Sequence, residues 1–245
     1  MTDGVVELMA AVDAAADPVA AEALARYFQV KPGGYGEGDV FIGVKLSELR
    51  RLVKPYLRAG LPLDGLERVL ASPVHEHRLT ALVLLADRAD HALKPRSKDP
   101  AELLAIHDVY LRNLTYVDNW DLVDGSAPAI VGGYLLDKPR DELYELVASS
   151  NLWARRAALV ATLRFIVEGQ TADTYRLAEL VLGDREDLIH KASGWMLREA
   201  GKRVDTTELL TFLDEHAPRM PRTMLRYAIE RLPDDLRRAY LRKPG

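Results

Sequence analysis

Apolar residues recur at spacings of three and four along almost the whole chain, and sustained apolar–polar alternation is scarce. This period is typical of amphipathic α-helices rather than of half-buried strands. Glycine, proline or serine interrupts the pattern, as at 60–62, 72–73, 138–139, 149–151 and 183–184. We therefore predict an all-α chain of short helices joined by short turns.

The residues at these interruptions have the chemistry of helix ends. Side chains that can accept a hydrogen bond at a helix start stand at Asp118, Asn151, Thr171 and Asp187. Gly169 and Gly201 are predicted to end helices, because glycine readily adopts the left-handed conformation that is common there. The sequence therefore contains residues suited to starting the expected helices and residues suited to ending them.

Successive short helices suggest stacked helix pairs of about forty residues, the size of a HEAT or armadillo unit. Such pairs form curved arrays with a concave surface. We expect residues 1–245 to be a single HEAT-like domain, an armadillo-type α-α superhelical solenoid with a concave basic groove. Because the segments share a pattern without a common consensus, a compact, non-repeating helical domain is the alternative.

Composition narrows the classes of function. The 245 residues include no cysteine, which excludes disulfides and thiolate metal sites and favours a reducing cytoplasm. The acidic start lacks the basic region of a secretory signal, and no apolar run approaches the length of a membrane span. A net charge of −4 does not indicate a nucleic-acid binder, so a nucleic-acid partner would require a local basic surface.

One segment departs from the helical pattern. KPGGYGEGDVFIGV, residues 31–44, holds five of the sixteen glycines and is predicted to be a loop that ends in a short extended or buried piece. Its glycines do not follow a strand and lack the lysine of a phosphate-binding loop. The six histidines show no metal-ligand spacing, with HEH at 75–77 lacking the H-E-x-x-H pattern. Neither a metal nor a cofactor is expected.

The tryptophans all stand among charged residues. Trp120 and Asp124 are four apart, so they project from the same side of a helix, while Leu122, Ala129 and Ile130 can form its buried side. By itself this pattern is typical of a core tryptophan beside a surface carboxylate. Asp121 can serve the helix start through the helix dipole.

The other two tryptophans have basic neighbours. Trp153 and Arg156, three apart, share one side of a helix, where the plain interpretation is an arginine stacked on an indole at the surface. A basic stripe with an indole in its middle, off the apolar line of the same helix, is formed by Lys191, Trp195, Arg198 and Lys202. A solvated face is the alternative there.

A fourth stretch, APRMPRTMLRYAIERL, repeats the basic theme without a tryptophan. Arg222, Thr223 and Arg226 stand at or near a predicted helix start, where they can donate hydrogen bonds to phosphates. A solvated helix face explains the same residues equally well.

In order from about Ala25 to Arg226, these stretches resemble the AlkD family of DNA alkylation-repair glycosylases, which are built from HEAT-like repeats. NWDLVD is similar to the family's W-D-x-V-D motif, LWARRAAL to its W-x-x-R-A-A segment, and KASGWMLRE to its K-A-x-G-W-x-L-R-E segment. ARYF and FIGV also resemble the family, whereas GGYGEGD departs from its best-known members.

The resemblance implies roles for individual residues. Asp124 stands at the position of the catalytic carboxylate, Trp120 and Trp195 where paired indoles contact the lesion's deoxyribose, and Arg156 where an arginine approaches the phosphate backbone. Further DNA contacts are implied at Tyr27, Lys45 and Arg198. With the basic residues singled out above, the expected DNA-binding set is Tyr27, Lys45, Lys191, Arg198, Arg222, Thr223 and Arg226.

The expected protein is therefore a monofunctional glycosylase that excises cationic N3- or N7-alkylated purines from double-stranded DNA, as a cytoplasmic, nucleoid-associated monomer with no membrane partner. Basic residues are expected to converge on the concave side: Arg156, Lys191, Arg198, Arg222 and Arg226. A non-catalytic DNA-binding protein of the same fold and a HEAT-like scaffold that binds protein are the alternatives.

Overall fold

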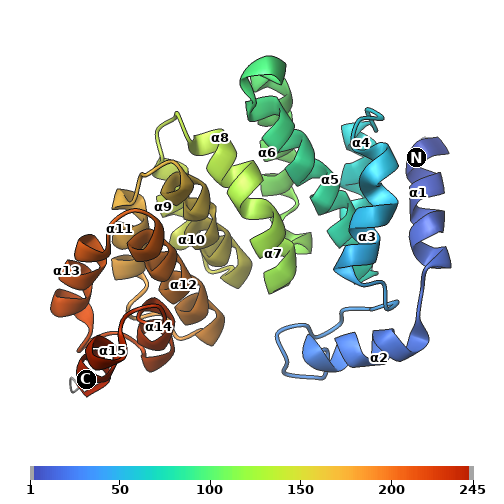
Figure 1. Cartoon of the computed structure of the whole chain (residues 1–245). Helices are drawn as coiled ribbons and strands as arrows, with labels where there is room; N and C mark the ends of the chain where they lie inside the picture. The colour runs from blue at the N-terminus through green and yellow to red at the C-terminus, as the bar shows by residue number, and fades with distance from the viewer. Residues whose placement is uncertain (1–2, 243–245) are drawn as a thin grey trace. The chain divides into compact units, whose positions relative to one another are not determined.

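A computed structural model describes residues 3–242 (Figure 1). Over this range the chain is α-helical, without a β-strand, and its single β-bridge joins Val40 and Val74. The all-α prediction is thereby confirmed. The chain divides into two compact units, Met1–Ile130 and Val131–Gly245, which are described separately. The single HEAT-like domain, the superhelical solenoid and the basic groove stay predictions.

Unit 1 is built around one long buried helix. Its helices are α1 (Asp3–Ala14), α2 (Pro18–Tyr27), α3 (Leu46–Val53), α4 (Leu63–Leu70), α5 (His75–Leu93), α6 (Pro100–Arg112) and α7 (Trp120–Ala127). Short 3-10 turns lie at Lys54–Tyr56, Pro95–Ser97 and Leu114–Tyr116. Helix α5 packs against α3, α4, α6 and α7, and α2 runs roughly crosswise to α1 and α3 (Figure 1). The predicted breaks at 60–62 and 72–73 fall on either side of α4.

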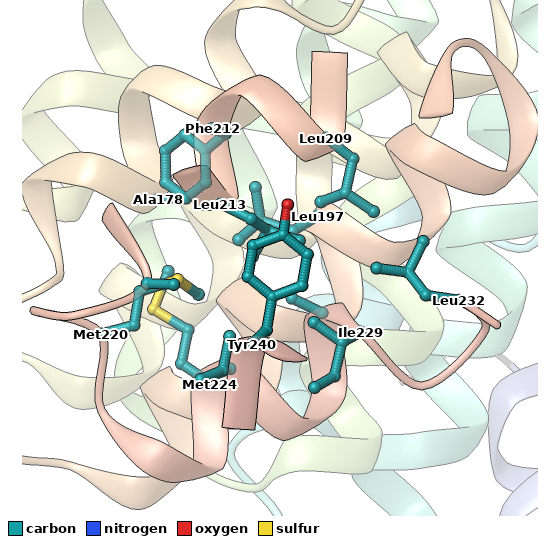
Figure 2. Close-up of a cluster of buried hydrophobic side chains, with 13 residues drawn as sticks. Ala178, Leu197, Leu209, Phe212, Leu213, Met220, Met224, Ile229, Leu232 and Tyr240 are labelled. Carbon is teal, nitrogen blue, oxygen red and sulfur yellow. The ribbon is translucent and has the colours of Figure 1, made fainter. Parts of the chain in front are cut away.

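Unit 2 is organised around α12. Its helices are α8 (Gly133–Leu135), α9 (Asp141–Val147), α10 (Leu152–Val167), α11 (Ala172–Leu180), α12 (Asp187–Arg203), α13 (Thr206–His216), α14 (Arg222–Ala228) and α15 (Asp234–Arg242). Helix α12 packs against α10, α11, α13 and α14. Figure 2 shows one of its cores, in which Leu197, Leu213, Met224, Ile229 and Tyr240 are buried together. A π-helical turn, Pro128–Gly132, connects α7 to α8.

Several predicted helix boundaries are confirmed. Asn151 caps α10 by accepting a hydrogen bond from the Trp153 N–H at 2.8 Å. Gly169 follows α10 with a φ of +77°, as a helix-ending glycine does. Thr171 and Asp187 stand at the starts of α11 and α12, but neither side chain caps its helix: the Thr171 hydroxyl donates to Glu208 at 2.7 Å, and Asp187 pairs with Lys191.

Two boundary predictions are wrong. Asn119, not Asp118, caps α7, and it accepts a hydrogen bond from the Trp120 N–H at 2.8 Å. Gly201 lies inside α12 rather than at its end. A Cβ there would stand 2.4 Å from Cδ2 of Leu209 on α13, so this glycine permits close helix packing instead of ending a helix.

The glycine-rich segment is a loop between α2 and α3, as predicted. Its end is held in place by Glu76 on α5, whose buried carboxylate accepts hydrogen bonds from the N–H groups of Ile42, Gly43 and Val44 at 2.8–3.2 Å. Gly43 has a φ of +92°, and a Cβ there would stand 2.0 Å from the Asp17 carbonyl oxygen. The end of the loop is therefore pinned onto unit 1.

Candidate functional site

The first turn of α7 begins with Trp120, whose indole is half-buried. Its ring stacks on Phe28, with centroids 5.2 Å apart and planes 15° from parallel. Tyr27 meets the same indole edge-on, at 6.0 Å and 73°. The end of α2 therefore supplies the ring surface on which Trp120 lies, and it brings together Tyr27 and Trp120, two residues that the sequence predicts to contact DNA.

The stack continues from Phe28 into the interior of unit 1. Phe28 stacks on Phe41 of the glycine-rich loop at 4.9 Å, and Phe41 stacks on the His75 imidazole at 4.4 Å. Three segments, α7, the α2–α3 connection and α5, thus contribute to one series of rings that runs from Trp120 to His75.

His75 lies between two carboxylates. Its Nδ1 is 2.9 Å from Asp39 Oδ2 and its Nε2 is 2.9 Å from Asp121 Oδ2, and only 1% of the residue is exposed. A neutral imidazole carries one N–H, whereas the cation can donate to both carboxylates. Burial lowers the pKa of His75, but the hydrogen bonds and charges of Asp121 and Asp39 outweigh burial and raise it to about 9. The imidazole is therefore cationic at neutral pH.

Asp39 connects His75 to the start of α7. Besides His75, its carboxylate accepts hydrogen bonds from Arg78 and from the Asn119 side-chain amide, the latter at 3.0 Å. Burial raises the pKa of Asp39, but His75 and Arg78 outweigh burial and lower it. Arg78 also donates to Asp118 at 3.1 Å. The polar residues around Trp120 are therefore explained by one hydrogen-bond network, in which the side chains of Asp118, Asn119 and Asp121 all take part.

Asp124 lies one turn after Trp120 and is partly exposed, while Leu122, Ala129 and Ile130 are buried as predicted. Burial raises the pKa of the Tyr110 hydroxyl strongly, a hydrogen bond with Ser126 opposes that rise, and the charge of Asp124 adds to it. Helix α7 therefore presents an indole and a carboxylate at two partly exposed positions four residues apart.

In unit 2, Trp153 and Arg156 are both buried, with exposed fractions of 9% and 5%. The interpretation of an arginine stacked on an indole at the surface is therefore wrong. Arg156 Nη1 donates to the Leu188 carbonyl oxygen at 2.5 Å, which ties α10 to the first turn of α12. A phosphate contact by Arg156 stays a prediction.

On α12, Trp195 is partly buried and packs against the small cluster of Ile166, Met196 and Ala200. Two basic residues of the stripe around it are paired with acids. Lys191 contacts Asp187 at 2.8 Å, and Arg198 contacts Glu199 and Glu230. Any phosphate bound by Lys191 or Arg198 would therefore compete with these carboxylates.

The remaining predicted DNA contacts differ in exposure. Arg222, the first residue of α14, donates to the Leu241 carbonyl oxygen at 2.8 Å, and Thr223 hydrogen-bonds with Asp187. Arg226 and Lys45 are exposed, and Tyr27 is 64% exposed. Tyr27, Lys45, Trp120 and Asp124 belong to unit 1, and the other predicted residues to unit 2. Their convergence on one surface stays a prediction.

Among residues 3–242, no group of three or more His, Cys, Asp or Glu side chains is arranged to hold a metal ion. Over the same residues, no helix combines the length and the apolar character needed to cross a membrane.

Comparison with known proteins decides the family. A family model described as "DNA alkylation repair enzyme" matches residues 8–232. The chain belongs to this family of AlkD-like proteins. Among solved structures, it is similar to a "Predicted DNA alkylation repair enzyme from Enterococcus faecalis", with a TM-score of 0.66 and 19% identity over 89% of this chain and 97% of that one. That identity supports the fold alone. No curated protein matches the chain.

Proposed function

We propose that this member of the DNA alkylation repair enzyme family is a monofunctional glycosylase that removes cationic N3- or N7-alkylated purines from double-stranded DNA. The observation that carries the proposal is the start of α7, where a half-buried indole and a partly exposed carboxylate lie four residues apart. Tyr27 stands beside the indole, and the family match covers the whole segment.

The chemistry of the substrate explains why few catalytic groups suffice. Alkylation at N3 or N7 gives the purine a positive charge, so the base leaves as a neutral molecule when the C1′–N9 bond breaks and its electron pair stays on the base. Protonation of the leaving group is therefore unnecessary. Positive charge moves onto the sugar, and water adds to C1′ with loss of a proton. The products are a free alkylpurine and an abasic site.

Asp124 supplies the negative charge that this sugar cation requires. A carboxylate held near C1′ is favourable only once positive charge has developed there, and fixed charges of this kind often dominate catalysis. The same carboxylate can accept the proton of the attacking water as a general base. Because no amine nucleophile is invoked, the reaction ends at the abasic site without strand cleavage.

The tryptophans select the charged lesion. The face of an indole attracts a cation by about 0.5–2 kcal/mol, depending on how far water is excluded. In the proposal, Trp120 and Trp195 contact the deoxyribose of the damaged nucleotide and prefer the cationic adduct to the normal base. The stack on Phe28 supports this role for Trp120, since it fixes the plane of the indole.

Basic side chains hold the phosphate backbone. Arg156 is proposed to bind a phosphate near the lesion, and the wider DNA contacts are those predicted from the sequence: Tyr27, Lys45, Lys191, Arg198, Arg222, Thr223 and Arg226. Phosphate contacts position a protein on DNA without reading its sequence. They therefore suit an enzyme that must find damage in any context.

Release of alkylpurine from methylated duplex DNA tests the proposal. The wild-type chain should release 3-methyladenine or 7-methylguanine in single-turnover reactions and leave the strand intact until the abasic site is cleaved by heat or alkali. An untreated duplex of the same sequence is the control. DNA binding without release would instead identify a non-catalytic DNA-binding protein, and absence of both would favour the protein-binding scaffold.

A further inference from the structure

We propose that His75 is a positioning residue, a buried cation that sets the placement of the Trp120 indole from inside unit 1. The role in repair rests on the proposed glycosylase function. His75 lies outside the set of residues that the family resemblance implies, and it touches no expected substrate atom. Its influence on Trp120 follows two separate routes, one through hydrogen bonds and one through stacked rings.

The first route is through the backbone of α7. Asp121 accepts a hydrogen bond from His75 with Oδ2 and one from the Leu122 N–H with Oδ1, both at 2.9 Å. On the other side of Trp120, the Asn119 side chain donates to Asp39, the second partner of His75. The residues on both sides of Trp120 are thus tied to the same imidazole, which fixes the rotation of the first turn of α7.

The second route is through ring faces. The His75 ring lies against Phe41, Phe41 against Phe28, and Phe28 against Trp120, with the planes of each pair within 25° of parallel. A change in the first ring therefore shifts the surface on which the indole rests. Since close packing transmits small displacements, the two routes act on the same side chain.

The positive charge of the His75 imidazole contributes to the placement of Trp120. The ionisable groups that face it are Asp39 from the glycine-rich loop and Asp121 from α7, while Arg78, from its own helix, joins Asp39 to Asp118. Loss of the His75 proton would remove one of the two hydrogen bonds that the ring donates, to Asp39 or to Asp121, and losing a hydrogen bond at a buried polar group is unfavourable. Deprotonation of His75 is therefore expected to make the side chain of Asp121 or Asp39 less well fixed, and with it the indole of Trp120.

Two substitutions separate the routes. His75→Phe keeps an aromatic ring at the base of the stack and removes both hydrogen bonds. His75→Gln keeps a side chain that can donate and removes the ring. We expect each folded variant to bind alkylated duplex DNA within about threefold of wild type while its single-turnover release rate falls about 10- to 100-fold, since misplacement by about 1 Å has effects of that size.

The readout of position is ¹⁹F NMR of protein containing 5-fluorotryptophan, with signals assigned by Trp→Phe replacement. The Trp120 signal should move in both variants, while the signals of Trp153 and Trp195 in unit 2 stay in place and serve as internal controls. An unmoved Trp120 signal in a folded variant, or an unchanged release rate, would overturn the proposal.

A titration of the wild-type protein covers the case in which the variants do not fold. ¹⁵N NMR of the histidine side chains follows His75 directly, and the Trp120 ¹⁹F signal should change with the same midpoint. A Trp120 signal that does not follow His75 would overturn the proposal. These measurements need no catalysis, so an inactive wild type would refute the glycosylase function while the placement of Trp120 is still decided.

Discussion

His75 Nε2 lies 2.9 Å from Asp121 Oδ2, and Asp121 is the residue next to Trp120. The contact joins the buried middle of unit 1 to the turn that carries the proposed lesion-binding indole. Because His75 also binds Asp39 of the glycine-rich loop, one imidazole holds the loop and α7 together. The stability of unit 1 and the placement of Trp120 are therefore both expected to depend on the protonation of His75.

Stability should fall as pH rises through the pKa of His75. Burial opposes the charge, but Asp121 and Asp39 raise the pKa from 6.5 to about 9. The stabilisation is therefore fully present below pH 6.5 and is lost as pH rises through 9. From the size of this shift, the loss is about 3 kcal/mol. Urea unfolding between pH 6 and 10 measures it, and a folded His75→Gln variant should lack this component. Equal pH dependence in both proteins would contradict the assignment.

Helix periodicity in the sequence indicates the all-α class and several of the helix boundaries. The breaks at 60–62, 72–73 and 149–151 all lie between helices, because glycine, proline, serine and asparagine favour turns where they cluster between apolar segments. The prediction that Gly201 ends a helix is wrong because the role of this glycine depends on Leu209, which lies on the next helix. A local pattern cannot distinguish a glycine that ends a helix from one that admits a neighbouring side chain.

Gly43 should tolerate alanine less well than Gly38. Both have a positive φ, +92° and +89°, so alanine is strained at each by about 1–2 kcal/mol. Only at Gly43 would the new Cβ meet other atoms, at 2.0 Å from the Asp17 carbonyl oxygen. Gly43→Ala should therefore destabilise unit 1 by about 1–3 kcal/mol more than Gly38→Ala. Chemical denaturation compares the two, and equal losses would mean that the end of the loop is not pinned.

The site was accessible from sequence only where its residues share one helix. The four-residue spacing of Trp120 and Asp124 fixed their common side because both lie on α7. The sequence does not reveal the role of His75, because its partners Asp39 and Asp121 are 36 and 46 residues away. One of the two acids that pair with Arg198, Glu230, is 32 residues distant, so this part of the charge balance is not visible in the local sequence.

Salt dependence should identify the cations that contact DNA. The logarithm of the DNA-binding constant falls linearly with the logarithm of the salt concentration. Removing one phosphate contact makes this line less steep by about 1. Arg226→Gln is expected to make it less steep by that amount, because Arg226 is exposed and belongs to the predicted DNA-binding set. Arg176→Gln removes the same charge from unit 2 at a side chain that lies 5.3 Å from the Tyr144 ring, and it should leave the slope unchanged. An equal salt dependence of DNA binding in the two variants would show that Arg226 does not contact a phosphate.

The carboxylate of Asp124 is the centre of the account, and an isosteric neutral replacement tests it most directly. Asp64→Asn is the matched control, because it removes a negative charge from an exposed pair with Arg68 on α4. In single-turnover release of alkylpurine from methylated duplex, Asp124→Asn should be slower than wild type by about 10²–10³-fold, the usual effect of losing one electrostatic stabiliser. Its Kd for the same DNA should stay within about threefold, and Asp64→Asn should match wild type in both. Release by Asp124→Asn at the wild-type rate, or a loss of DNA binding equal to the loss of release, would contradict the catalytic role.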